Sequence, residues 1–247
     1  MYREIDGLRL HYNVFGKGAP ILFIHGWGGS RCSMHSLAKH AARRFQCFTI
    51  DLPGFGKSEN PPKHWGVKEY AQCILQFMKQ QKIVPHYFGH SFGGELGIYI
   101  AAHHPASIRS LILCNSSFKR SRKISRTASL ASQLNVNSYA LIKKIYPFAK
   151  KIYYSLFHRG SDLLKYPALE SNFRTIIFED LTETTKIIKK PTLILWGEND
   201  TITPVLWAWE LHRNIPRSKI VVVPKATHNL PITQPAIVWK ELASFIS

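Results

Sequence analysis

A serine, an aspartate and a histidine in this sequence are of the types that together carry out nucleophilic catalysis. Ser91 lies between two glycines in the segment GHSFG, residues 89–93. A serine hydroxyl is a weak nucleophile at neutral pH, and it needs a general base within hydrogen-bond reach and a carboxylate that orients this base. His228 and Asp200 would supply these groups. The pattern Gly-x-Ser-x-Gly alone arises by chance in about one chain in ten of this length, so its surroundings must support it.

A glycine-rich stretch, HGWGGS at residues 25–30, has the composition of a loop that binds a developing negative charge. Its glycines let backbone N–H groups approach a substrate closely. The amides of Trp27 and of Phe92, the residue after Ser91, would then form an oxyanion hole. Both donors therefore point to acyl transfer as the chemistry.

The sequence predicts that these residues are positioned by a parallel sheet covered by helices on both faces. Short runs rich in Ile, Val, Leu and Phe alternate with longer amphipathic stretches, which is typical of this α/β class. We predict strands over Pro20–His25, Gln46–Asp51, Ile83–Gly89, Ile108–Asn115, Pro191–Trp196 and Lys219–Val223, and an antiparallel edge strand over Leu8–Val14. We predict helices over Ser33–Arg44, Val67–Gln81, Phe92–His104, Val205–Arg213 and Pro235–Ile246.

The three candidate residues each follow a different predicted strand. Ser91 lies where the strand 83–89 meets the next helix, Asp200 follows the strand ending at Trp196, and His228 follows the strand ending at Val223. Because the carboxyl ends of parallel strands meet at one edge of a sheet, where ligands bind in such folds, we expect these side chains to lie together.

A long segment interrupts the alternation of strands and helices. About 75 residues between Asn115 and Pro191 contain no convincing strand and are helical in character, and a structureless loop of that length is uncommon in a compact domain. We therefore predict a helical cap over residues 117–185, set into a core domain of residues 1–116 and 186–247.

The predicted cap carries much of the unusual charge of the chain. The sequence has 33 Lys and Arg against 15 Asp and Glu, a net charge of +18. Residues 117–165 hold eleven Lys and Arg and one Asp, or +10 of that total. Such a run is either a solvated face or a platform for an acidic carrier protein, an anionic substrate or an anionic membrane surface. Nucleic acid is not expected as a partner, because the segment contains no recognisable binding motif.

Composition limits the class of protein and its cellular location. Apolar residues make up 45% of the chain, which is typical of a globular protein. We find neither the apolar core of a signal peptide nor a membrane-spanning run, so we expect a cytoplasmic protein without integral membrane association. The four cysteines are far apart and show no Cys-x-x-Cys spacing, which favours reduced, packed thiols over a metal site. No metal or organic cofactor is expected.

Five motifs, in order over nearly the whole chain, make it resemble the α/β-hydrolase family. They are HGWGGS, DLPGFGKS at residues 51–58, GHSFGG at 89–94, LWGENDTITP at 195–204 and ATHNLP at 226–231. The resemblance implies an α/β-hydrolase fold with a cap between the sixth and seventh strands. Among its members the chain looks most like small carboxylesterases, including pimeloyl-carrier-protein methyl ester esterases. Serine at position 91, instead of aspartate, argues against the dehalogenase and epoxide hydrolase branches.

Other residues receive lesser roles or none. Asp51 in DLPGFG is interpreted as a turn residue, and His25 and His90 are expected to hold loops. Glu95 departs from the family, which usually has a small or apolar residue there, and the sequence assigns it no role. Candidates for lining a substrate pocket are Trp27, Trp207 and Trp209.

The expected function is hydrolysis of carboxylic esters through an acyl-enzyme on Ser91. The same three residues would also cleave a lactone, a thioester or a carbon–carbon bond of a vinylogous diketone, and the motifs do not separate these substrates. A carrier-protein methyl ester esterase would use the basic cap for docking. A non-catalytic ligand receptor on the same frame is a further alternative, which the complete Ser91, Asp200 and His228 set argues against.

Overall fold

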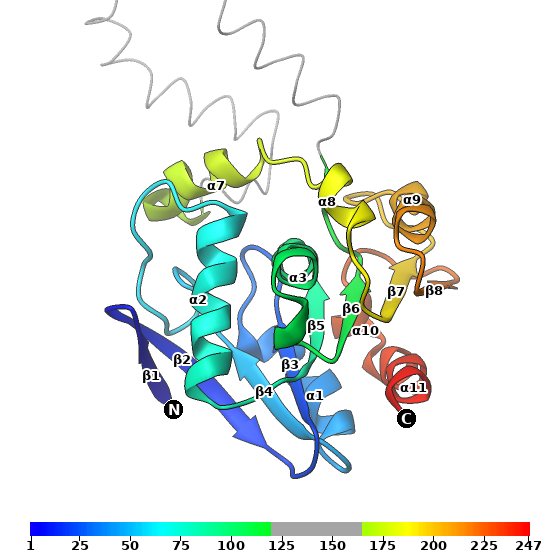
Figure 1. The fold of residues 1–247 in the computed structure, drawn as a ribbon, viewed down its shortest axis with the longest axis horizontal. Coiled ribbons are helices and arrows are strands. Elements are labelled where there is room, and N and C mark those ends of the chain that lie inside the picture. The colour runs from blue at the N-terminus through cyan, green and yellow to red at the C-terminus, as the bar shows by residue number, and fades with distance from the viewer. Residues whose placement is uncertain (120–164) are drawn as a thin grey trace, which may run out of the picture.

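The computed structural model describes residues 1–119 and 165–247 of the chain (Figure 1). Most of the predicted cap, residues 120–164, lies outside the described residues. The predicted boundaries of that cap at residues 117 and 185 therefore stay a prediction. None of the described helices combines the length and apolar character that crossing a lipid bilayer requires.

The described residues form an eight-stranded, mostly parallel sheet in the order β1-β2-β4-β3-β5-β6-β7-β8. Pairing of β1 with β2 and of β2 with β4 is antiparallel, and all other pairs are parallel. The strands are β1 (Tyr2–Ile5), β2 (Leu8–Phe15), β3 (Pro20–Ile24), β4 (Gln46–Ile50), β5 (His86–His90), β6 (Ser110–Cys114), β7 (Thr192–Gly197) and β8 (Ser218–Val223). The chain order reverses direction across the sheet at β3, between β4 and β5, which is where ligands bind in open α/β sheets.

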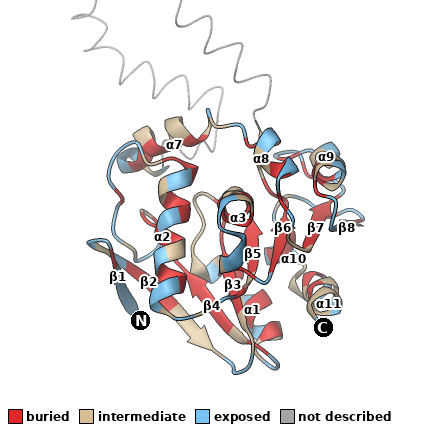
Figure 2. Ribbon diagram, viewed as in Figure 1, coloured by how far each residue is buried: buried red, intermediate tan, exposed pale blue. Residues whose placement is uncertain are grey.

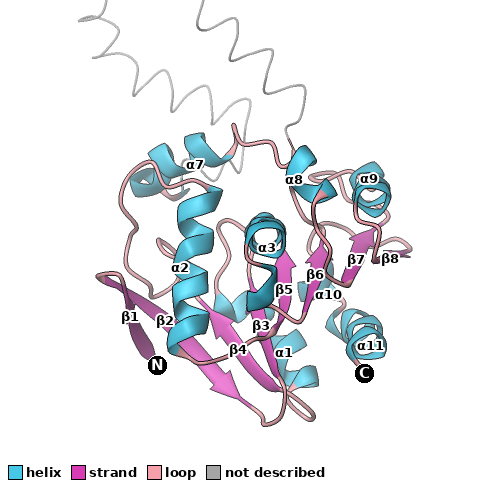
Figure 3. Ribbon diagram, in the orientation of Figure 1, coloured by secondary structure: helices cyan, strands magenta, loops and turns pink. Residues whose placement is uncertain are grey.

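Helices cover both faces of this sheet (Figure 3). The α-helices are α1 (His35–Ala41), α2 (Val67–Gln80), α3 (Phe92–His103), α7 (Glu170–Ile176), α8 (Thr182–Lys186), α9 (Leu206–Asn214), α10 (Leu230–Thr233) and α11 (Pro235–Ile246). Short 3-10 turns occupy η1 (Arg31–Met34), η2 (Pro105–Ser107) and η3 (Pro167–Leu169). Buried residues of α2, α3 and α9 pack on one face, and those of α1, α10 and α11 pack on the other.

The strands divide their side chains between two cores. Figure 2 shows that most of the sheet from β3 to β7 is buried. In β3, Leu22 and Ile24 join the core beneath α2 and α3, whereas Ile21 and Phe23 join the core beneath α1 and α11. Successive side chains of a strand point to opposite faces. A parallel strand that is covered on both sides must therefore be apolar throughout, which is why these runs are visible in the sequence.

Glycine brings α3 unusually close to the strands. A Cβ added at Gly93 would lie 2.6 Å from the carbonyl oxygen of Ile24 and 2.8 Å from that of His25. These contacts are with backbone, which cannot rotate away as a side chain can. The first turn of α3 therefore rests directly on the end of β3.

The end of the predicted cap packs on the core. Leu169 belongs to the core beneath α2 and α3, and the side-chain amide of Asn172 donates to the carbonyl of Pro62 at 2.8 Å. The backbone N–H of Val67, at the start of α2, donates to the carboxylate of Glu179 at 2.9 Å. These contacts fix residues 165–186 against the sheet and its helices.

All seven predicted strands are present, with ends that differ by up to three residues. The fold prediction is confirmed, but β2 is not the edge strand that we predicted for Leu8–Val14, because β1 pairs along its outer side. The strand β1 was missed because YREI is short, and three of its four residues are exposed. The helix predicted over Ser33–Arg44 is shorter, since a 3-10 turn capped by Ser30 precedes α1.

Gly93→Ala is expected to lower the free energy of unfolding by about 2 kcal/mol, because the new methyl group would force α3 away from β3. Urea unfolding followed by circular dichroism measures the change. Gly7→Ala is the control, since nothing lies within 4 Å of its added Cβ and its positive φ of 81° alone carries a cost. A Gly93→Ala protein as stable as the wild type would contradict the close packing.

Candidate active site

Ser91 lies at a sharp turn between β5 and α3. Its backbone has a φ of 51° and a ψ of −116°, in a region that residues with a side chain rarely adopt. Its N–H donates to the carbonyl of Cys114 at the end of β6, at 3.1 Å. A Cβ at Gly89 would meet the carbonyl oxygen of Gly93 at 2.3 Å, so the flanking glycines of the motif permit this turn. Such a turn presents the serine hydroxyl at the carboxyl end of the sheet.

The structure brings Ser91, His228 and Asp200 into one hydrogen-bonded chain. Nε2 of His228 lies 3.0 Å from Oγ of Ser91, and Nδ1 of His228 lies 2.9 Å from Oδ2 of Asp200. A neutral imidazole that donates from Nδ1 to Asp200 presents its Nε2 lone pair to the serine hydroxyl. The arrangement has the geometry for removing the proton of Ser91.

Asp200 is held by more partners than the sequence indicated. Its Oδ1 accepts the backbone N–H groups of Ile202 at 2.8 Å and Thr203 at 2.9 Å. Its Oδ2 accepts the side chains of Asn115 and Thr203, each at 2.6 Å. Asn115 and Thr203 were not predicted as site residues. A signal was available for Asn115, which directly follows the buried strand β6.

This environment keeps Asp200 ionised. Burial favours the neutral carboxyl, but hydrogen bonds from His228, Thr203 and Asn115 outweigh it and lower the pKa of Asp200 from 3.8 to about 2. A carboxylate that accepts several hydrogen bonds is stabilised in its charged form. Asp200 therefore keeps a negative charge beside Nδ1 of His228 throughout the neutral range.

The segments that carry the two predicted amide donors lie beside Ser91. A Cβ at Gly26 would be only 2.9 Å from Cβ of Ser91, so the loop after β3 passes directly next to the serine. Phe92 is the first residue of α3, where an N–H group has no acceptor within its own helix. Trp27 and Phe92 line the same cavity as Ser91.

This cavity has a volume of about 280 Å³ and is mostly apolar. Its apolar wall is formed by Trp27, Phe92, Phe173, Ile176, Ile177, Ile202 and Trp207. Polar groups enter it from Ser117, Lys119 and Glu179, and also from Glu95. The structure thus places two of the three predicted tryptophans at the cavity. Trp209 is half-exposed and lies outside it, in a hollow with Leu206 and Arg213.

The remaining predicted residues hold loops. Nδ1 of His25 donates to the carbonyl of Gly26 at 2.7 Å, and Nε2 of His90 donates to the carbonyl of His228 at 2.8 Å. Burial lowers the pKa of both imidazoles to about 4, so both are neutral. Asp51 accepts hydrogen bonds from the backbone of Arg31 at 2.7 Å and from the side chain of His11 at 2.8 Å.

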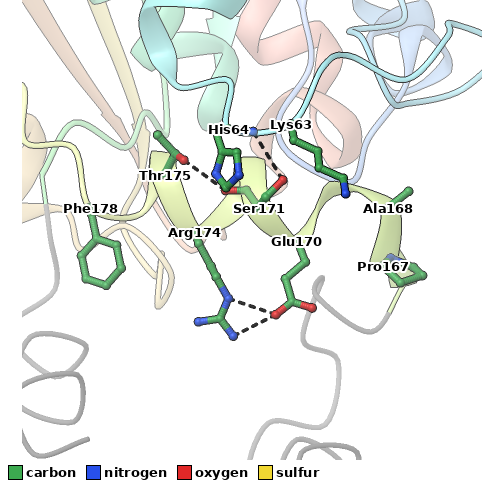
Figure 4. Close-up of a pocket in the computed structure, with 9 residues that line it drawn as sticks. All are labelled: Lys63, His64, Pro167, Ala168, Glu170, Ser171, Arg174, Thr175 and Phe178. Carbon is green, nitrogen blue, oxygen red and sulfur yellow. Dashed lines mark hydrogen bonds and ion pairs between the residues drawn. The ribbon is translucent and has the colours of Figure 1, made fainter. Parts of the chain in front are cut away.

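A larger hollow of about 610 Å³ lies elsewhere on the described surface (Figure 4). Lys63 and His64 line it together with residues of α7. In it Arg174 pairs with Glu170 at 2.9 Å, and the hydroxyl of Ser171 accepts the N–H of His64 at 3.4 Å. It contains none of the predicted catalytic residues. Among residues 1–119 and 165–247, no group of three or more His, Cys, Asp or Glu side chains is arranged to hold a metal ion.

Asp200→Asn should alter how stability depends on pH. Because the pKa of Asp200 is depressed in the folded protein, its charge stabilises the fold above about pH 4, and this contribution is lost as the pH falls towards 2. The free energy of unfolding of wild type should exceed that of Asp200→Asn by about 2 kcal/mol at pH 6, and the two should converge near pH 2. Urea titrations at several pH values measure this. A difference that stays constant would contradict it, and Asp6→Asn at the exposed β1–β2 turn is the charge control.

Family models and curated relatives match most of the chain. A family model described as "alpha/beta hydrolase fold" matches residues 19–141, and a second, described as "TAP-like protein", matches residues 178–247. Among curated relatives, a pimeloyl-[acyl-carrier protein] methyl ester esterase of Vibrio vulnificus is 23% identical and covers 96% of this chain and 97% of its own. Lipase 1 of Psychrobacter immobilis is 27% identical, and the match covers 85% of this chain and 71% of the lipase.

A solved structure shares the fold over the full chain. The enol-lactonase from Burkholderia xenovorans superposes with a TM-score of 0.79 at 21% identity, and the match covers 100% of this chain and 99% of that one. At this identity the likeness concerns the fold alone. Taken with the family models and the relatives, the eight-stranded sheet and its serine turn identify the chain as a member of the α/β-hydrolase family and as a hydrolase of the esterase type.

Proposed function

We propose that the protein hydrolyses carboxylic esters with Ser91 as nucleophile, His228 as general base and Asp200 as the group that orients and stabilises His228. The observation that carries this proposal is the hydrogen-bonded chain from Ser91 through His228 to Asp200, at the wall of an apolar cavity. A nucleophile, a base and an orienting carboxylate in this sequence of contacts are what acyl transfer needs.

The reaction follows from the positions of these atoms. His228 takes the proton of Ser91 at Nε2 while Oγ of Ser91 attacks the ester carbonyl. The amides of Trp27 and Phe92 donate to the oxyanion of the tetrahedral intermediate. The protonated His228 then gives its proton to the departing alcohol, which leaves an ester of the acyl group on Ser91. A water molecule, deprotonated by His228, attacks this acyl-enzyme and restores Ser91.

Asp200 acts through His228 in this scheme. An ionised carboxylate beside Nδ1 stabilises the imidazolium that forms when His228 accepts the proton. The low pKa of Asp200, about 2, means that the carboxylate does not take the proton itself. Asn115 and Thr203 are proposed as positioning residues, because each donates to Oδ2 of Asp200.

Ser91→Ala should lower kcat for p-nitrophenyl butanoate by at least about 10³-fold, since no other group replaces the nucleophile. Release of p-nitrophenol measures the rate. Ser107→Ala, in the η2 turn, is a matched control that should retain the wild-type rate. Full turnover by purified Ser91→Ala would refute the mechanism, and a fluorophosphonate probe should label the wild type but not this variant.

A more specific candidate is hydrolysis of a methyl ester whose acyl group is attached to an acidic carrier protein. Several curated relatives carry the name pimeloyl-[acyl-carrier protein] methyl ester esterase. The net charge of +18, with ten of these charges within residues 117–165, favours attraction of an acidic protein.

Salt separates this candidate from general esterase activity. We expect kcat/KM for a methyl ester carried by an acyl-carrier protein to fall at least tenfold between 20 mM and 500 mM NaCl, because ions screen attraction between exposed charges. Turnover of p-nitrophenyl butanoate is the internal control and should change little. Equal salt dependence of the two substrates would argue against carrier docking while leaving ester hydrolysis intact.

A further inference from the structure

Glu95 brings a carboxyl group into the mostly apolar Ser91 cavity. It lies on α3, four residues after Ser91, and lines the cavity together with Ser91, Trp27 and Phe92. Its Oε2 is buried and has no hydrogen-bond partner among the described residues. A buried polar atom without a partner is costly to a folded protein, so its place beside the reacting group calls for a functional explanation.

The charged groups that surround this cavity are engaged elsewhere. Glu179 accepts the backbone N–H of Val67 at 2.9 Å and so caps the start of α2. Lys119 forms an ion pair with Glu210. Lys119 is thus paired with Glu210, and among the described residues no other cation lines the cavity.

Glu95 is mainly neutral at neutral pH. Burial raises its pKa from 4.5 to about 8; a hydrogen bond from Ser117 opposes this shift, and the negative charge of Glu179 adds to it. Burial also raises the pKa of the Tyr70 phenol on the adjacent α2, so that group is neutral as well. A protonated carboxyl has one O–H donor to offer.

Charged or titratable groups also lie on two other parts of the described chain. On α8, which packs against α3, Glu183 and Lys186 form a surface pair with each other at 2.7 Å. His228 lies at the Ser91 end of the cavity, where Nε2 faces the serine hydroxyl. The other charged groups that line the cavity are thus Glu179 and Lys119, of which Lys119 is paired with Glu210.

We propose that Glu95 determines specificity in this cavity by donating a hydrogen bond to a second oxygen of the bound ester, such as that of a ketone. The inference rests on the proposed ester hydrolysis at Ser91. Four residues along an α-helix span about 6 Å, so this oxygen would lie roughly 6 Å from the ester carbonyl. The cavity would then favour an oxygen-bearing ester over an alkyl ester of the same length.

The test compares esters matched in length. One pair, p-nitrophenyl 4-oxopentanoate and p-nitrophenyl pentanoate, places the ketone in the acyl chain. A second pair, 3-oxobutyl butanoate and butyl butanoate, places it in the alcohol. For each pair the ratio of kcat/KM values is measured for wild type, Glu95→Gln and Glu95→Leu, with Glu183→Gln as an exposed charge control. Comparing this ratio between variants cancels the intrinsic reactivity of the esters.

In at least one pair we expect Glu95→Leu to lower the ratio about tenfold, because it leaves the substrate oxygen without a donor. Glu95→Gln should keep most of the preference, since its amide also donates. In the wild type the ratio should fall as the pH rises through about 8 and Glu95 loses its proton, whereas the ratio for Glu95→Gln should not depend on pH. The ratio falls because Glu95 without its proton can no longer donate a hydrogen bond to the substrate oxygen.

Two results would overturn the proposal. One is a ratio that is the same in wild type and Glu95→Leu for both pairs, with turnover that still depends on Ser91. The other is a wild-type preference for butanoylcholine over the neutral 3,3-dimethylbutyl butanoate that disappears in Glu95→Gln. Such a preference would mean that Glu95 is an ionised carboxylate that binds cationic substrates. Failure of the ester-hydrolysis proposal looks different, because Ser91→Ala would then turn over all four esters as fast as wild type. Thermal unfolding of each variant confirms that it is folded.

Discussion

The turn at Ser91 constrains the rest of the site. A backbone φ of 51° with a ψ of −116° costs a residue with a side chain about 1–3 kcal/mol of conformational energy. Favourable packing around the turn must offset this cost. Gly93 lets α3 approach the end of β3, and Gly26 lets the neighbouring loop pass beside Ser91. The small side chains around the serine therefore allow three backbone segments to converge, and the predicted oxyanion donors come from two of them.

Charge is distributed unevenly around the hydrogen-bonded chain of Ser91, His228 and Asp200. Four donors besides His228 surround the carboxylate of Asp200, while His25 and His90 are held neutral by burial. Glu95, which lines the Ser91 cavity, is kept mainly protonated by burial. Two carboxyl groups near one nucleophile thus differ in their main protonation state at neutral pH, because burial dominates at Glu95 whereas hydrogen bonds outweigh burial at Asp200.

The sequence predicted the sheet, and it predicted that Ser91, Asp200 and His228 lie together, because both predictions rest on strong local patterns. Strands buried on two faces are continuously apolar, and Ser91, Asp200 and His228 each follow such a strand. The strand β1 was not predicted because it is short and mainly exposed. Asn115 and Thr203 were not predicted as site residues for another reason. Their role depends on where the carboxylate oxygens of Asp200 lie, and that is a property of the folded chain. Glu95 was visible in the sequence, but only its burial in the cavity suggests a task for it.

The contacts of residues 165–186 bear on how this chain could be divided or recombined. Tyr166 donates its hydroxyl to the carbonyl of Gly28 at 2.9 Å, and Glu179 caps α2. A chimera that exchanged the whole of residues 117–185 with a relative would remove both attachments along with the segment it meant to replace. Crossover points near residues 119 and 165 would keep them, so the transplantable unit is shorter than the interruption seen in the sequence.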